Sequence, residues 1–178
     1  MKKVMILGAG VYQVPLILKA REMGLYTIVV SISGNYPGFD FADKVYYEDT
    51  TDYEKVLEIA RSENINGIVT AGTDVAVITV GKVCDEMGLC GLSFEAAQIA
   101  ADKLLMKEQY EKYGVRTARF RKILFRDEQI EEKLAELRAP LIFKAVDSSG
   151  SRGIIRVDFP EQFQETISKV KNYTKKDY

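Results

Sequence analysis

Short apolar runs alternate with amphipathic segments along the first half of the chain. The runs "VMIL" (residues 4–7), "YTIVVSIS" (26–33) and "GIVTAG" (67–72) are rich in apolar and β-branched side chains, and a shorter run lies near "KVYYED" (44–49). Continuous apolar runs are typical of parallel strands that are covered on both faces, whereas half-exposed strands alternate. The pattern therefore predicts an α/β sheet domain with parallel strands over residues 1–92.

Helices are predicted between these strands. Pro15 suits the first turn of one helix, which should stop at Gly24 because glycine readily takes the left-handed conformation. Thr51 and Glu54 have the spacing of a capping box before a second helix. Asp74 is expected to cap a third helix, whose apolar positions form one stripe: Ala76, Val80, Val83, Cys84 and Met87.

The pattern changes after residue 92. Residues 93–114 are predicted to be a helical connector, with Ser93 and Asp102 as caps and Gly114 as the stop. Residues 115–178 are predicted to form a smaller α+β unit in the order strand, helix, strand, loop, strand, helix. Its strands are "RFRKILF" (119–125), "PLIFKAV" (140–146) and "GIIRV" (153–157), and its last helix carries the stripe Phe163, Ile167 and Val170. The charged ending "KNYTKKDY" shows no feature that would close a domain.

Composition narrows the classes of function. The 178 residues carry 25 basic and 26 acidic side chains, a net charge of −1, which gives no reason to expect a nucleic-acid partner. No apolar run approaches the ~20 residues of a membrane span, and "MKKVMILGAG" is better interpreted as a first strand than as a signal peptide. Together with two cysteines interpreted as thiols, this predicts a cytoplasmic protein. The chain has no histidine, which excludes histidine-dependent triads and histidine-ligated zinc within it.

The glycines of "GAGVYQVP" suggest a dinucleotide site, but the details disfavour one. Gln13 stands where the dinucleotide fingerprint needs its third glycine, and the second strand ends in Ser31 to Ser33 without the acidic residue that holds a ribose. Two interpretations stay open. The segment is either a tight strand-to-helix turn or the edge of a crevice for a small substrate, in which case the candidate contacts are Gly10, Gln13, Thr73 and Asp74.

Lys144 stands at the end of an apolar run, directly before the loop "DSSGSRG" (147–153). Backbone N–H groups of small residues can converge on an anion, and a strand lysine can reach phosphate oxygens as a point charge. The order fits neither a Walker A loop nor a protein kinase, where the glycine-rich loop precedes the lysine. Taken alone, the motif is equally compatible with a plain hairpin and a solvated lysine.

A second phrase, "AADKLLMKEQYEKYGVRTARF" (100–120), precedes Lys144 by some forty residues. The ordered pair "ADKLLMK" and "PLIFKAVDSSGSRGI" resembles the ATP-grasp superfamily, in particular the branch of carbamoyl-phosphate synthase, biotin carboxylase and the purine-pathway carboxylases. "NGIVTAGTD" in the front half fits the same family, whereas Ala118 stands where the family often has proline. The resemblance implies a Rossmann-like pre-ATP-grasp sheet domain (1–92), the helical connector (93–114) and a small α+β ATP-grasp subdomain (115–178).

The resemblance also implies roles for residues. Lys144 would contact the α- and β-phosphates of ATP and Lys103 would approach the phosphates from the hinge side, while a mobile flap would close over them through backbone donors of Ser149, Gly150, Ser151 and Gly153. The adenine hinge and the Mg²⁺ ligands of the family lie farther along than Tyr178. We therefore expect an incomplete portion of a longer enzyme that is inactive by itself.

For the intact enzyme the resemblance implies an ATP-dependent ligase that joins a small-molecule carboxylate to an amine, or another nucleophile, through an acyl-phosphate. Relatives often form homodimers. The alternative is a non-catalytic module that binds a metabolite or a nucleotide. Among the lysines, Lys144 is expected to matter for nucleotide binding far more than Lys122.

Overall fold

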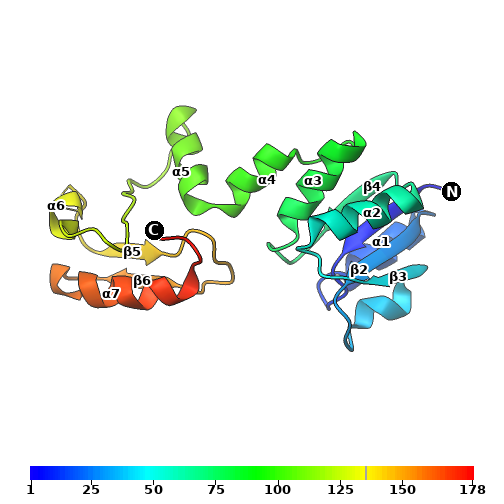
Figure 1. Ribbon diagram of the computed structural model, residues 1–178, viewed down its shortest axis with the longest axis horizontal. Coiled ribbons are helices and arrows are strands. Elements are labelled where there is room, and N and C mark those ends of the chain that lie inside the picture. Colours follow the sequence, from blue (N-terminus) through cyan, green and yellow to red (C-terminus); the bar gives the residue numbers. More distant parts are fainter. Residues whose placement is uncertain (135) are drawn as a thin grey trace. The chain divides into compact units, whose positions relative to one another are not determined.

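The computed structural model describes residues 1–134 and 136–178, which form two compact units, Met1–Ala101 and Asp102–Tyr178 (Figure 1). The first unit is built on four parallel strands: β1 (Lys3–Leu7), β2 (Tyr26–Ser31), β3 (Lys44–Tyr47) and β4 (Gly67–Thr70). Their order in the sheet is β3-β2-β1-β4. The predicted α/β class with a parallel sheet is confirmed.

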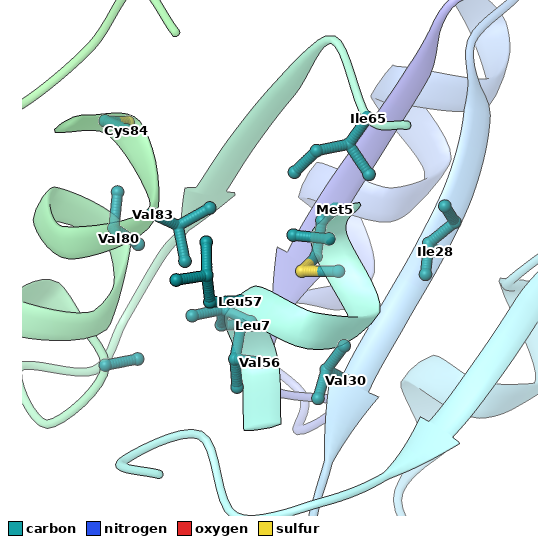
Figure 2. Packing of buried hydrophobic residues seen from close by; sticks show 12 residues of the cluster. Met5, Leu7, Ile28, Val30, Val56, Leu57, Ile65, Val80, Val83 and Cys84 are labelled. Atoms are coloured by element: carbon teal, nitrogen blue, oxygen red, sulfur yellow. The ribbon is translucent and has the colours of Figure 1, made fainter. Parts of the chain in front are cut away.

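Both faces of this sheet are covered, as the continuous apolar runs predicted. Met5 and Leu7 of β1 belong to one hydrophobic cluster and Ile6 to another, because successive side chains of a strand point to opposite faces. Helix α1 (Val14–Glu22) packs with Ile6, whereas α2 (Tyr53–Glu63) and α3 (Val77–Met87) pack with Met5 and Leu7. Figure 2 shows the cluster around Met5 and Leu7, which includes Val80, Val83 and Cys84 of the predicted stripe, with Val83 next to Leu57.

Two predicted helix caps in the first unit are wrong. The N-cap of α2 is Asp52, whose carboxylate accepts the N–H of Lys55 at 3.2 Å, while the Thr51 hydroxyl donates instead to Asp49. Helix α3 begins at Val77, and Asp74 contributes only its backbone carbonyl to that turn. The remaining short elements of the unit are a 3₁₀ turn, η1 (Pro37–Phe41), and the helix α4 (Phe94–Ala101), which the Ser93 hydroxyl caps as predicted.

The second unit contains an antiparallel hairpin of β5 (Leu141–Lys144) and β6 (Ile154–Val157). Its helices are α5 (Lys103–Lys112), α6 (Ile130–Leu134) and α7 (Phe163–Val170), with 3₁₀ turns η2 (Pro160–Gln162) and η3 (Lys171–Tyr173). Phe163 and Ile167 of α7 pack with Val157 of β6 and with α6, as the predicted stripe requires.

Two further predictions for this unit are wrong. The segment "RFRKILF" is not a strand. The sheet of this unit consists of β5 and β6, and the segment pairs with neither. Its residues Ile123 and Phe125 nevertheless pack against the core of the unit. The charged ending does help to close the unit: the Phe125 N–H donates to the Asp177 carbonyl at 3.0 Å, and the Lys176 ammonium pairs with Asp102.

Candidate functional site

The β5–β6 hairpin presents Lys144 at its open end. Lys144 is the last residue of β5 and lies opposite Ile154, and the Ala145 N–H donates to the Gly153 carbonyl at 3.0 Å just beyond this pair. The side chain of Lys144 is exposed and lines a cavity of about 500 Å³. Within residues 1–134 and 136–178 the Lys144 ammonium has neither a hydrogen bond nor an ion pair. Its charge is therefore available to a ligand.

The cavity beside Lys144 has a strongly cationic lining. Among the residues described there, the basic ones are four lysines, Lys103, Lys107, Lys122 and Lys144, and three arginines, Arg119, Arg121 and Arg138, and none is acidic. The rest of the wall is mainly apolar, with contributions from the Phe120 and Ile142 side chains. An apolar cavity lined by several basic residues suits a ligand that combines a flat apolar part with negative charges.

Lys103 enters this cavity from the first turn of α5. Its ammonium donates to the Ala145 carbonyl at 3.1 Å and to the Ser148 carbonyl, and its backbone N–H donates to the Val146 carbonyl at 3.0 Å. The structure thus brings the two predicted lysines, Lys103 and Lys144, to one cavity, with Lys103 attached to the loop that follows Lys144.

Asp102 fixes the start of α5. Only 4% of the residue is exposed, and one carboxylate oxygen, Oδ1, accepts the N–H groups of Leu104 and Leu105 at 2.8 and 3.0 Å. The other oxygen, Oδ2, pairs with the Lys176 ammonium. Burial raises the pKa of Asp102, but the hydrogen bonds from Lys176 and Leu105 outweigh it and hold the pKa below its ordinary value. Asp102 therefore acts as an ionised cap that keeps Lys103 in place.

The predicted flap forms a tight loop with its own hydrogen bonds. Gly150, Ser151 and Gly153 have φ values of 64°, 60° and 67°, and the Ser148 hydroxyl donates to the Arg152 carbonyl at 2.6 Å. Gly153 is buried, and a Cβ there would lie 2.7 Å from Cβ of Tyr173. Among the described lining of the 500 Å³ cavity, the four predicted flap residues are absent. Their part in nucleotide binding stays a prediction.

The predicted substrate contacts lie in the first unit, at the carboxyl ends of two adjacent strands. Gly10 and Gln13 follow β1, and Thr73 and Asp74 follow β4. From β1 the chain continues to β2, which pairs on one side of β1, whereas β4 pairs on the other side of β1. The loops after β1 and β4 therefore flank the topological switch point of the sheet, where α/β proteins bind ligands. Gln13 itself is 5% exposed, and its Nε2 donates to the Ala71 carbonyl, which joins the two loops.

Sequence reasoning missed most of the cationic lining. Lys122, which is expected to matter far less than Lys144, lines the same cavity, and its ammonium lies 3.6 Å from the ring centroid of Tyr178. Lys107 lines it as well and donates to the Thr117 hydroxyl at 2.5 Å and the Ala118 carbonyl at 2.9 Å. The available signal was the "DKLLMK" spacing, which places Lys103 and Lys107 one helical turn apart.

Residues 1–134 and 136–178 contain no group of three or more histidine, cysteine, aspartate or glutamate side chains arranged to hold a metal ion. No helix in the same described part is long and apolar enough to cross a membrane.

Comparison with known proteins gives the class of the chain. No family model matches it. The alanine–anticapsin ligase of Bacillus subtilis (strain 168) is 24% identical over 143 residues, which are 77% of this chain and 30% of the relative. The carbamoyl phosphate synthase large chain of Thermotoga petrophila is 26% identical over 184 residues, covering 94% of this chain and 16% of the relative. The chain thus spans less than half the length of these curated relatives.

Solved structures agree with the sequence matches. Phosphoribosylglycinamide synthetase from Anaerococcus prevotii superimposes with a TM-score of 0.74 at 32% identity, over 99% of this chain and 44% of that one. The biotin carboxylase domain of Hydrogenobacter thermophilus 2-oxoglutarate carboxylase, a dimer in complex with MgADP, ADP and bicarbonate, gives 0.80 at 21% identity, over 96% of this chain and 40% of that one. These relatives are ATP-grasp enzymes, and the chain is similar to a part of each. The predicted resemblance is confirmed.

Proposed function

We propose that this chain forms the substrate-side sheet and the phosphate-binding hairpin of an ATP-dependent ligase that joins a small-molecule carboxylate to an amine. The observation that carries this proposal is the cavity of about 500 Å³, whose described lining includes four lysines and three arginines and no acidic side chain. Such a wall favours a polyanion that also has an apolar ring, which is the chemistry of a nucleoside triphosphate. The ligase among the relatives and the MgADP of the biotin carboxylase structure support the same choice.

In this proposal the two lysines of the cavity hold the phosphate groups. Lys144 contacts the α- and β-phosphates as an exposed point charge, and Lys103 approaches them from the start of α5. Backbone N–H groups of the flap residues Ser149, Gly150, Ser151 and Gly153 close over the phosphates. Mg²⁺ arrives with the nucleotide, and its carboxylate ligands are supplied from outside these 178 residues.

The substrate side of the site lies at the switch point of the parallel sheet. There Gly10, Gln13, Thr73 and Asp74 face a small-molecule carboxylate or amine. Residues 1–92 act as the Rossmann-like pre-ATP-grasp domain, 93–114 as the connector and 115–178 as the small α+β ATP-grasp subdomain. The intact protein forms a homodimer, as the biotin carboxylase neighbour does.

The chemistry needs positioning and charge neutralisation more than acid–base groups, which agrees with a chain that has no histidine. A carboxylate oxygen attacks the γ-phosphorus and ADP leaves, which gives an acyl-phosphate. The amine then attacks the acyl carbon, phosphate leaves, and the amine loses its proton. Lys144 and Lys103 offset negative charge on the phosphates during the first step.

Calorimetric titration of a non-hydrolysable ATP analogue into the chain tests the nucleotide site. One charge-assisted hydrogen bond is worth about 1.5–3 kcal/mol, so Lys144→Ala should weaken binding roughly 10- to 100-fold. Lys169→Ala is the matched control, because Lys169 is an exposed lysine of the same unit that pairs with Glu165 on α7. It should leave the affinity within about twofold.

Equal losses in the two variants would contradict the role of Lys144. Lys122→Ala does not serve as the control, because Lys122 lines the same cavity. ADP release by the intact enzyme, assayed with a panel of carboxylates and amines, tests the reaction itself. Nucleotide binding without turnover on the whole panel would favour a non-catalytic binding module.

A further inference from the structure

Helix α5 carries two lysines that each hold a different loop of the cationic cavity. The Lys103 ammonium donates to the carbonyls of Ala145 and Ser148, at the start of the glycine-rich loop. One turn later the Lys107 ammonium donates to Thr117 and Ala118, on the segment that follows α5. One helix face thus fixes two loops by the same chemistry, a lysine bonded to neutral backbone or hydroxyl oxygens.

The attachment at Lys103 is concentrated on the residues directly after Lys144. Besides its two ammonium bonds, Lys103 donates its backbone N–H to the Val146 carbonyl at 3.0 Å. Ala145 is fully buried, so this part of the loop is also fixed by packing. Lys103 therefore determines where the chain goes after Lys144, whether or not its ammonium ever touches a ligand.

The acceptors that Lys103 uses are weaker than those a nucleotide would offer. The bonds from the Lys103 ammonium to carbonyls are already charge-assisted, but a phosphate oxygen also carries a negative charge, whose Coulomb attraction lets it compete well against a carbonyl. Lys103 and Lys144 line one cavity, so a triphosphate held by Lys144 lies where it can compete for the Lys103 ammonium. An ammonium has three N–H donors, so phosphate oxygens that take two or more of them displace the Ala145 or the Ser148 carbonyl.

We propose that Lys103 is a positioning residue that alternates between two sets of acceptors, and that this exchange releases the glycine-rich loop when nucleotide enters. Without nucleotide the ammonium holds the Ala145 and Ser148 carbonyls and keeps the loop in one conformation. With nucleotide it turns to the phosphates, and the loop beyond Asp147 is free to close. The exchange rests on the nucleotide site proposed above, whereas the attachment in the free chain does not.

The contacts of the loop define which part moves. Asp147 accepts the Lys175 N–H at 3.1 Å, and Gly153 is buried against Tyr173, so both ends stay attached to the unit. Between them the Ser148 hydroxyl donates to the Arg152 carbonyl, which keeps the tip together. Residues 148–152 therefore move as one segment.

Carbonyl carbon NMR of the labelled chain tests the attachment directly. Losing a hydrogen bond from an ammonium shifts a carbonyl ¹³C resonance upfield, so Lys103→Met should shift the Ala145 and Ser148 signals upfield. Lys107→Met is the matched control, because it removes the same group one turn away on the same helix. It should shift the Ala118 carbonyl and leave those of Ala145 and Ser148 at their wild-type positions. Lys103→Arg restores a cationic donor and should return the Ser148 signal toward the wild-type value.

Limited trypsin digestion gives a second measure, because Arg152 is exposed in the tip of the loop. Cleavage after Arg152 in the nucleotide-free chain should be several-fold faster in Lys103→Met than in wild type, and unchanged in Lys107→Met. Wild-type Ala145 and Ser148 carbonyl positions in Lys103→Met, together with wild-type cleavage, would overturn the attachment.

Titration of the non-hydrolysable ATP analogue tests the exchange. In the wild-type chain the Ser148 carbonyl signal should move toward its position in Lys103→Met as nucleotide binds, and in that variant the nucleotide should cause no further upfield shift. Nucleotide binding, seen at Lys144 or by ³¹P broadening, without movement of the Ser148 signal would overturn the exchange while the nucleotide site stands. Failure of nucleotide to bind would overturn the site and the exchange together, while the attachment is still judged from the free chain.

Discussion

Glu63 offers a prediction whose magnitude follows from the structure. It is the last residue of α2 and is only 7% exposed, and its carboxylate accepts three hydrogen bonds, from the ammonium groups of Lys3 at 2.8 Å and Lys44 at 2.5 Å and from the Tyr46 hydroxyl at 2.5 Å. Lys3 begins β1 and Lys44 begins β3, so this cluster joins the amino ends of two strands to a helix. The cluster lies at the amino ends of the strands, whereas the candidate substrate site lies at their carboxyl ends.

These bonds hold the pKa of Glu63 at about 2, against an ordinary value of 4.5, with the hydrogen bond from Lys3 as the largest cause and that from Lys44 next. A fall of about 2.5 in pKa corresponds to about 3 kcal/mol. The side chains of Lys3 and Lys44 are 36% and 45% exposed, so solvent screening reduces the expected contribution to about 2 kcal/mol. Because the folded pKa is depressed, this stability is present above about pH 4.5 and is lost as the pH falls toward 2.

Glu63→Gln should therefore lower the free energy of unfolding of the first unit by about 2 kcal/mol at pH 7 and by much less near pH 2.5. Urea unfolding of the chain measures this, with the NMR signals of the Met5–Leu7 amides as reporters of the first unit. Glu86→Gln is the control, because Glu86 is a more exposed carboxylate of the same unit that pairs with Arg61 and Lys82. Equal losses for Glu63→Gln at the two pH values would refute the reasoning.

The second unit gives two further predictions. Gly153→Ala should destabilise it by more than about 2 kcal/mol, because a Cβ there would lie 2.7 Å from Cβ of Tyr173, whereas Gly150→Ala, with a similar φ but open space, should cost about 1 kcal/mol. Urea unfolding of both variants, followed through the Val157 amide, compares them, and equal costs would contradict the packing argument. Asp102→Ala removes the cap of α5 and the partner of Lys176, and should cost about 2 kcal/mol or more at pH 7 in the same assay. Asp102→Asn, which keeps a capping oxygen, should cost less, and the reverse order would contradict the assignment of Asp102 as an ionised cap.

Much of the fold could be predicted because its elements are determined by local patterns. Strands β1 and β2 have continuous apolar runs, and the α3 stripe recurs at helical spacing, so each signals its own burial. The cap of α2 could not be chosen from the sequence, because Thr51 and Asp52 are adjacent residues that both favour the position. The segment 119–125 has the composition of a strand, but a strand forms only where its backbone pairs with another strand, and composition does not show which segments pair.

The candidate site, too, could be predicted only in part from the sequence. Lys103 and Lys144 could be selected because each lies within a motif, "ADKLLMK" and the run before "DSSGSRG". The basic run "RTARFRK" (116–122) was an available signal for Arg119 and Lys122, but only the tertiary fold brings it together with Arg138 and the lysines of the two motifs. The nearly equal numbers of basic and acidic residues in the chain give no sign that basic residues predominate around one cavity.

The bond from Gln13 to the Ala71 carbonyl has a thermodynamic consequence for any molecule that binds at the switch point. Two loops that are already joined in the free protein lose little conformational entropy when a ligand binds, because they were ordered during folding. A small metabolite that makes few contacts can then be held there, and replacing Gln13 would weaken its affinity by separating the two loops as well as by removing a contact.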